Sequence, residues 1–196
     1  MSGMSVIAIT MQYGSGGKEI GAKLADELQL PLYDGRLSDE AARRSGLSSR
    51  LFDTTEFFEN GRFSRFADIS ASAPVLGIED VIYVEQARII REAAERGPCV
   101  IVGKGCCKVL EDMPGVLHVF VHADMECRGA RIMDEFSVTK AYAMKLIRTE
   151  DRRRNNFLKT YLGNRFSRME GYHLCIDSGF FDICGAVRIV KSAYTN

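Results

Sequence analysis

The chain has 196 residues, of which 46% are hydrophobic, so it is long enough for one compact domain with a substantial buried core. Its 26 basic and 26 acidic residues cancel, which argues against a nucleic-acid or membrane-surface partner bound through overall charge. The six cysteines form no CxxC pair and several lie inside apolar runs that suit a small buried side chain, so we expect reduced thiols. The chain starts without a leader pattern, and no apolar run approaches the roughly 20 residues of a membrane helix, so we expect a cytoplasmic protein.

A short strand, a glycine-rich loop and a helix are expected at the start of the chain. Residues 6–10, VIAIT, form a β-branched run, and apolar side chains recur at helical spacing over 17–28. Pro31 ends this pattern because proline cannot continue a helix. The connecting segment GSGGKE, residues 14–19, carries three glycines and a lysine.

The next region is less regular until a long helix begins. Two short helices are expected, at 37–46 behind a Ser38 N-cap and at 47–58. Residues 59–77 show no clear period and are interpreted as a loop or a mobile insert. A long amphipathic helix follows over 79–95, and its apolar face suits either the core or a contact between subunits, so a homo-oligomer stays open.

Continuous apolar runs at 99–103, 116–123 and 172–177 are typical of strands buried on both faces. With the strand at 6–10 and a short second strand before Asp34, they bring the number of expected strands to five. Strands that alternate with helices predict a parallel sheet covered by helices on both faces. Ligands of such a sheet bind at the carboxyl ends of its strands.

The loop at 14–19 occupies such a position, because it follows the first strand and leads into a helix. Glycines let backbone N–H groups converge on an anion, and a helix N-terminus adds roughly half a positive charge. Against the phosphate-binding pattern GxxxxGK[ST], Gln12 replaces the first glycine and Glu19 the hydroxyl residue when Lys18 is aligned with the motif lysine. A glycine turn that only caps a helix therefore stays an alternative to a phosphate site.

An arginine-rich segment, RTEDRRRNN at 148–156, forms a second positive cluster. Phosphoryl transfer needs positive donors around the phosphates, and the planar guanidinium binds phosphate in a fixed geometry. Spacing alone favours a solvated helix, since Arg148 with Asp151 and Glu150 with Arg154 are placed for surface pairs. The residue types alone leave both a mobile lid and a solvated helix open.

Several single residues suit two roles each. Asp34 suits an acceptor hydroxyl or a magnesium-bound water but also a helix cap, and Lys104 suits a phosphate or a solvated turn. Arg128 is expected on a solvated helical face. His118 and His122 share one strand face without a third ligand nearby, so no metal site is predicted.

Separated stretches of the chain resemble bacterial cytidylate kinases and, above all, the cytidylate kinase-like family. They are IAIT with GSGGKEIGAKLADEL, LYDG at 32–35, CVIVGKG at 99–105, DRRRNN at 151–156 and CIDSG at 175–179. The resemblance covers nearly the whole chain. It implies an α/β fold of the P-loop NTPase type, a three-layer sandwich with a five-stranded parallel sheet like that of nucleoside monophosphate kinases. It also implies one domain over 1–196, with an acceptor-side insert at 35–85 and an arginine-rich helical lid at 136–165.

The resemblance also assigns roles to particular residues. Those implied to bind the nucleotide are Gly14, Ser15, Gly16, Gly17, Lys18, Glu19 and Arg131. Those implied to act in catalysis are Lys18, Arg152 and Arg154. Asp34 and Lys104 would contact the acceptor substrate, whereas Arg153 replaces an aspartate of the family pattern.

Two registers are open for the loop. A gap-free match places Gly17 at the family's phosphate-binding lysine, whereas a one-residue shift places Lys18 there. In the gap-free register the backbone cradle survives, but Glu19 would repel the triphosphate unless magnesium intervened. In the shifted register, Ser15 or a carboxylate-bound water would replace the magnesium hydroxyl.

The resemblance implies Mg²⁺-dependent transfer of the γ-phosphoryl group from ATP to a small acceptor, with CMP and dCMP as the candidate acceptors. Such transfer works by positioning and charge neutralisation rather than through a covalent intermediate. The missing motif positions favour an alternative of another class: a nucleotide-binding regulatory protein or a degenerate kinase that holds phosphate without efficient transfer. Neither reading involves a nucleic-acid or membrane partner.

Overall fold

The computed structural model describes residues 5–34, 44, 78–103, 105–157 and 168–196, without the side chains of 78–82. Five strands form one parallel sheet in the order β2-β3-β1-β4-β5. The strands are β1 (Val6–Met11), β2 (Leu32–Tyr33), β3 (Cys99–Val102), β4 (Val116–His122) and β5 (Leu174–Asp177). The helices are α1 (Gly17–Leu28), α4 (Ile78–Glu95), α5 (Cys106–Val109), α6 (Met125–Phe136), α7 (Lys140–Phe157), the 3₁₀ helix η5 (Met169–Gly171) and α8 (Asp182–Thr195).

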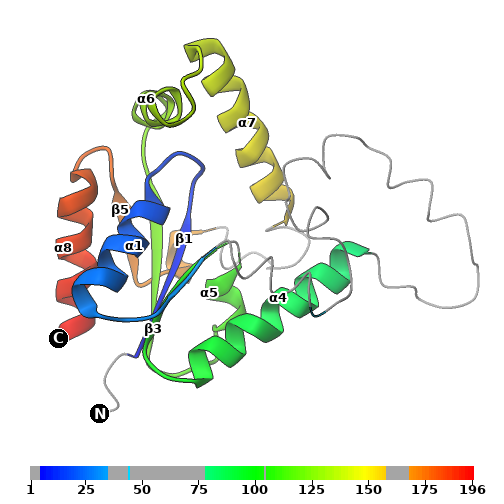
Figure 1. Cartoon of the computed structure of the whole chain (residues 1–196), viewed down its shortest axis with the longest axis vertical. Coiled ribbons are helices and arrows are strands. Elements are labelled where there is room, and N and C mark those ends of the chain that lie inside the picture. Colours follow the sequence, from blue (N-terminus) through cyan, green and yellow to red (C-terminus); the bar gives the residue numbers. More distant parts are fainter. Residues whose placement is uncertain (1–4, 35–43, 45–77, 104, 158–167) are drawn as a thin grey trace, which may run out of the picture.

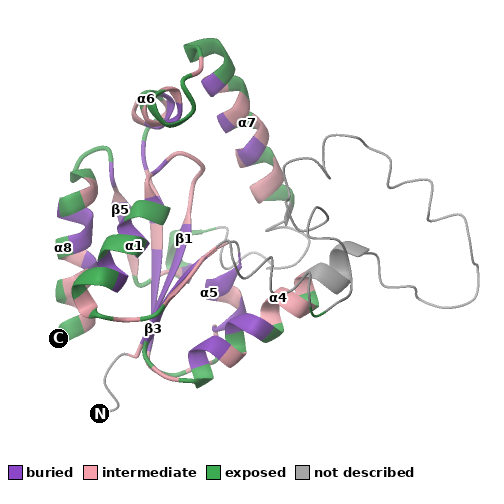
Figure 2. Ribbon diagram, in the orientation of Figure 1, coloured by how far each residue is buried: buried purple, intermediate pink, exposed green. Residues whose placement is uncertain are grey.

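Helices cover both faces of the sheet, as the alternating pattern predicts. Figure 1 shows α1 and α8 on one side and α4 and α5 on the other. β1 serves both layers, because Val6 and Ala8 pack toward α4 and α5, whereas Ile7 and Ile9 pack toward α1 and α8. All four side chains are fully buried (Figure 2), which explains why the central strands read as continuous apolar runs.

The long elements match the sequence prediction closely. The helices expected at 17–28 and 79–95 are confirmed as α1 and α4, and the strand expected at 6–10 extends to Met11. The apolar face of α4 lies in the core, where Ile89 and Ile90 pack against the sheet and α5. The short α5 and the C-terminal α8 were not predicted. Apart from Arg44, the helices expected at 37–46 and 47–58 and the irregular stretch at 59–77 lie outside the described residues.

Two helices stand beyond the carboxyl ends of the strands, α6 and α7 (Figure 1). They pack on each other through Ile132, Ala143 and Ile147, and Tyr13 from the loop after β1 joins this cluster. The arginine-rich segment therefore belongs to a helix that contacts the glycine loop. In the described part of the chain, no helix is apolar and long enough to cross a bilayer.

Candidate phosphate-binding site

The glycine loop joins β1 to α1 at the carboxyl edge of the sheet. Gly14 and Gly16 have positive φ angles of 75° and 78°. Glycine adopts this left-handed conformation readily, whereas a residue with a side chain would be strained in it. A Cβ on Gly16 would lie 2.4 Å from Cδ1 of Ile183, and one on Gly17 would lie 2.7 Å from Cβ of Met11. The loop thus requires glycine for its conformation at position 14, for space at position 17, and for both reasons at position 16.

The N-terminus of α1 opens onto this loop. Its first intrahelical bond runs from the Ile20 N–H to the Gly16 carbonyl at 3.0 Å, so the N–H groups of residues 17–19 have no partner within the helix. Lys18 and Glu19 are exposed in the first turn, and Glu19 lies 3.7 Å from Lys23. Backbone donors, the helix dipole and a lysine are therefore presented together, an arrangement suited to an anion.

Ser15 faces the opposite way, into the protein, and is fully buried. Its hydroxyl lies within hydrogen-bond distance of two carbonyl oxygens, that of Gln12 at 2.8 Å and that of Val121 at 3.1 Å, and donates its one proton to the nearer. The Ser15 N–H also donates to the Gln12 carbonyl. The Gln12 side chain accepts from the N–H of Ala123 at 3.3 Å, which ties the loop to the end of β4. Ser15 and Gln12 thus shape the loop from beneath, and the Ser15 hydroxyl is not directed at a ligand.

Arg131 on α6 lies beside the loop. Its Cζ is 3.7 Å from the position that a Cβ on Gly16 would take. Nη1 donates to the Ser178 hydroxyl at 3.1 Å and Nη2 to the Ser178 carbonyl at 2.8 Å. The guanidinium is thus held in place by Ser178, and its positive charge lies next to the glycine turn.

Arg128 is buried, so the expectation of a solvated helical face is wrong. Its side chain is 6% exposed, and Nη1 lies 2.7 Å from Oδ2 of Asp151 and 3.3 Å from the Tyr13 carbonyl. The helical period of α6 turns this residue toward α7 and the loop rather than toward water. One guanidinium thereby joins α6, the arginine-rich helix and the loop.

In its described residues, the arginine-rich segment does not form the expected pairs of Arg148 with Asp151 and Glu150 with Arg154. Asp151 binds Arg128, and Glu150 lies 2.5 Å from Arg153, with both of these side chains largely buried. Arg154 packs its guanidinium over the Phe120 ring, 4.9 Å from the centroid, and burial lowers its pKa. Arg152 is exposed. The prediction of a solvated helix therefore holds for Arg152 but not for the buried side chains of this segment.

With this geometry in place, the chain can be compared with known proteins. Residues 6–179 match the model of the cytidylate kinase-like family. The chain belongs to that family. Comparison with curated protein sequences returned no significant match.

Solved structures share the fold at low sequence identity. An uncharacterised protein from Eubacterium ventriosum is 23% identical with a TM-score of 0.74, over 97% of this chain and 98% of the other. The shikimate kinase of Bacteroides thetaiotaomicron is 16% identical with a TM-score of 0.58, over 97% and 98%. That of Acinetobacter baumannii, in complex with shikimate, is 14% identical with a TM-score of 0.52, over 97% and 90%. The fold is thus that of P-loop kinases, and together with the family it supports phosphoryl transfer and nucleotide binding as the general chemistry.

The residues expected to contact an acceptor are described only in part. Asp34 follows β2 at the same edge of the sheet as the loop and is half-buried. Lys104 lies outside the described residues, as does most of the expected insert at 35–85. Among the described residues no cluster of three His, Cys, Asp or Glu side chains is placed to hold a metal ion.

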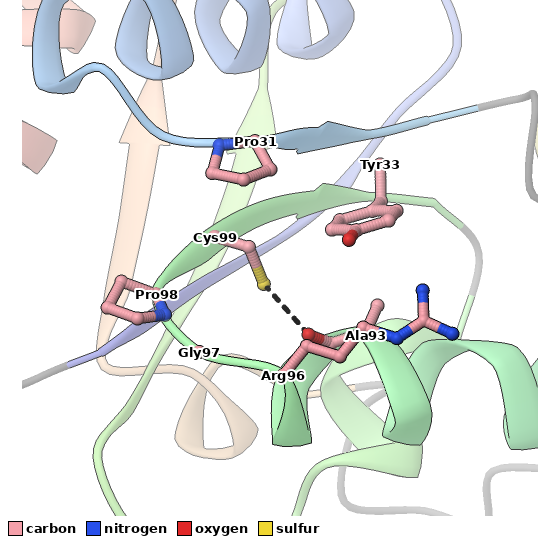
Figure 3. A pocket seen from close by; sticks show the side chains of 7 residues that line it. All are labelled: Pro31, Tyr33, Ala93, Arg96, Gly97, Pro98 and Cys99. Carbon is pink, nitrogen blue, oxygen red and sulfur yellow. Dashed lines mark hydrogen bonds between the residues drawn. The ribbon is translucent and has the colours of Figure 1, made fainter.

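A small cavity of about 100 Å³ lies at the opposite end of the sheet (Figure 3). Tyr33, Arg96 and Cys99 are among its lining residues. Cys99 opens β3, whereas the glycine loop follows the last residue of β1, so the cavity is remote from the loop. Burial raises the pKa of Cys99 to about 11, which keeps this thiol protonated and unreactive at neutral pH.

Sequence reasoning missed Ser178, Gln12 and Asp151 as parts of the site. Ser178 was seen only as one letter of CIDSG, and its contact with Ser15 spans 163 positions. Asp151 was assigned to a local pair, although its partner Arg128 lies 23 positions away. Local spacing carries no signal for either contact. Gln12 was visible as a departure from the phosphate-loop pattern, which marked the position without revealing its role.

Proposed function

We propose that this protein transfers the γ-phosphoryl group of ATP to a small acceptor. The observation that carries the proposal is the glycine loop, whose left-handed glycines, exposed Lys18 and neighbouring Arg131 form a positive cradle at the start of α1. Membership of the cytidylate kinase-like family supports ATP as the donor and CMP or dCMP as the first acceptors to test.

The backbone of Gly14, Gly16 and Gly17 would hold the donor phosphates, and Lys18 would neutralise the charge that develops on them. Gly17 and Lys18 both lie in the first turn of α1, and the proposal takes the shifted register because Lys18 is the one of the two that carries a positive charge. Such a site accelerates transfer through positioning and electrostatic stabilisation.

The segment at 136–165 would act as the lid, with Arg152 and Arg154 as its phosphate ligands. Arg152 is exposed and free to approach a bound nucleotide. Arg154 has a buried Nε without a hydrogen-bond partner among the described residues, which supports a further acceptor in the working complex. Arg154 would leave the Phe120 ring or remain there as a fixed positive charge.

The described residues of the site offer few side chains that could bind a magnesium ion. Mg²⁺ held there would supply positive charge against the donor phosphates. The Ser15 hydroxyl points inward, so Glu19 is the side chain in the first turn of α1 that would reach the ion, directly or through water. One carboxylate with phosphates and waters is a common Mg²⁺ arrangement.

One observation favours the alternative of a nucleotide-binding regulatory protein. Glu19 stands where the phosphate-loop pattern has a hydroxyl, and its charge opposes that of a triphosphate. A protein that binds ATP but turns it over slowly would have this composition. Turnover and binding therefore need to be measured on the same samples.

The test is a coupled ATP-turnover assay with Mg²⁺ and a panel of CMP, dCMP, UMP, AMP, GMP, shikimate and simple alcohols. Acceptor-dependent turnover is expected, and Lys18→Ala should lower it on the order of 10²-fold, as loss of one transition-state donor does. Lys191→Ala is the matched control, because Lys191 is a surface lysine paired with Glu27 on the far side of α1. Turnover unchanged by Lys18→Ala would reject the role of this lysine, and ATP binding without turnover would favour the regulatory alternative.

A further inference from the structure

Ser178 joins four segments of the molecule through one buried hydroxyl. It follows β5 directly, is fully buried, and donates its own N–H to the His122 carbonyl at the end of β4 at 2.9 Å. Its hydroxyl lies 2.6 Å from the carbonyl oxygen of Ser15 and 3.2 Å from that of His122, and it accepts from Nη1 of Arg131 at 3.1 Å. No local pattern in the sequence predicts this junction.

The geometry decides where the single hydroxyl proton goes. A serine hydroxyl donates one hydrogen bond and accepts up to two. The Ser15 carbonyl is the closer acceptor, and Arg131, which can only donate, occupies a lone pair of the hydroxyl oxygen. The proton therefore lies between Ser178 and the Ser15 carbonyl, where the charge of Arg131 strengthens the bond.

Fixing this carbonyl fixes the amide that follows it. The peptide between Ser15 and Gly16 is trans, so its C=O and N–H point in opposite directions. With the carbonyl held inward by Ser178, the Gly16 N–H points away from Ser178. A flipped peptide would instead present a carbonyl oxygen to an incoming phosphate and repel it.

We propose that Ser178 is a positioning residue that orients the Ser15–Gly16 peptide so that the loop offers an N–H, and not a carbonyl, to the polyphosphate of the donor. The inference rests on the proposed function for the identity of the ligand. It assigns Arg131 a supporting part, because its bond to the Ser178 hydroxyl holds that hydroxyl in this orientation, and its bond to the Ser178 carbonyl fixes the guanidinium.

The test compares Ser178→Ala with Thr10→Val, each of which removes one buried hydroxyl. Thr10 lies on β1, is 2% exposed and donates to Sγ of Cys107 at 3.3 Å, so the control loses a similar bond outside the loop. Calorimetric titration with inorganic tripolyphosphate should show about threefold to tenfold weaker binding in Ser178→Ala than in the wild type, the usual range for one hydrogen bond. Thr10→Val should bind like the wild type.

Kinetics separate positioning from a merely structural effect. In Ser178→Ala the KM for Mg·ATP should rise by the same factor while kcat and the acceptor KM hold, because binding common to ground and transition states is lost. Equal tripolyphosphate affinity in Ser178→Ala and wild type would overturn the inference. If the alanine variant does not fold, Ser178→Cys, with a weaker donor of similar size, is judged by the same criterion.

The outcomes for the two proposals are distinguishable. A wild-type protein that binds no tripolyphosphate contradicts both. Wild-type binding without turnover, weakened in Ser178→Ala, supports the positioning role and rejects the kinase. Turnover with unchanged binding in Ser178→Ala rejects the positioning role alone.

Discussion

Replacing Asp151 by alanine would remove the carboxylate that pairs with the buried guanidinium of Arg128. The two groups lie 2.7 Å apart, with the Arg128 side chain 6% exposed and that of Asp151 25% exposed. The same guanidinium donates to the Tyr13 carbonyl, so the pair also holds α7 against the loop. The variant therefore tests the connection between the arginine-rich helix and the phosphate cradle.

The size of the effect follows from the burial of the two partners. Loss of one partner of a buried ion pair costs about 3–5 kcal/mol, whereas exposed pairs contribute roughly 0–1 kcal/mol. Because Asp151 is 25% exposed, water can partly solvate the released guanidinium, and we expect a loss of about 3 kcal/mol. At this chain length that corresponds to a lowering of the melting temperature by roughly 6–12 °C.

Thermal unfolding followed by circular dichroism measures this difference. Asp134→Ala is the control, because Asp134 is exposed on α6, the helix that carries Arg128. The double variant Arg128→Met/Asp151→Leu should recover most of the lost stability, since it removes both charges and fills the space. If Asp151→Ala melts within about 2 °C of Asp134→Ala, the pair is worth no more than a surface pair, and the argument from burial is refuted.

Three further outcomes are expected. Gly16→Ala should lower the free energy of unfolding by about 1–3 kcal/mol and abolish tripolyphosphate binding, since φ is 78° and the new Cβ would lie 2.4 Å from Ile183. Gly103→Ala is the control and should do neither, because a Cβ at Gly103 would have no neighbouring atom within 4 Å. Burial raises the pKa of Cys99 to about 11, above the unfolded thiol value of about 8.5, so the contribution of this thiol to stability is complete below pH 8.5 and is lost as pH rises toward 11. In denaturant titrations, the free energy of unfolding of Cys99→Ala should therefore fall less steeply over this pH range than that of the wild type. A thiol reagent at pH 8 should modify exposed Cys184 and spare buried Cys99 in the native protein, and equal labelling of the two would contradict the packing described above.

Periodicity and composition carried most of the fold. The apolar alternation of α1 and α4 and the apolar runs of β1, β3, β4 and β5 are local signals, which the chain displays wherever it lies in space. The four-residue α5 is too short to show a helical period, so it could not be predicted in this way. The glycines at 14 and 16 likewise marked the loop, since few other residues accept the left-handed backbone it needs there.

Contacts between distant segments could not be predicted from such local signals. The spacing of Arg148 and Asp151 fits a surface pair, yet burial of Arg128 makes it the stronger partner for Asp151. The helical period of α6 places Arg128 on the same face as Ile132, but α7, the helix that covers this face, comes later in the chain. The role of Ser178 depends in the same way on a loop formed 163 positions earlier.

The sequence by itself thus determined the parallel α/β architecture, the place of the glycine loop after β1 and the residue types available to bind phosphate. Only the tertiary structure decided which of those groups face the ligand: Ser15 turned inward, Arg131 held by Ser178, and Arg128 buried against Asp151. The physical reason is that conformational preference and apolar period are properties of neighbouring residues. Desolvation and hydrogen-bond partners, in contrast, depend on which segments the fold packs together.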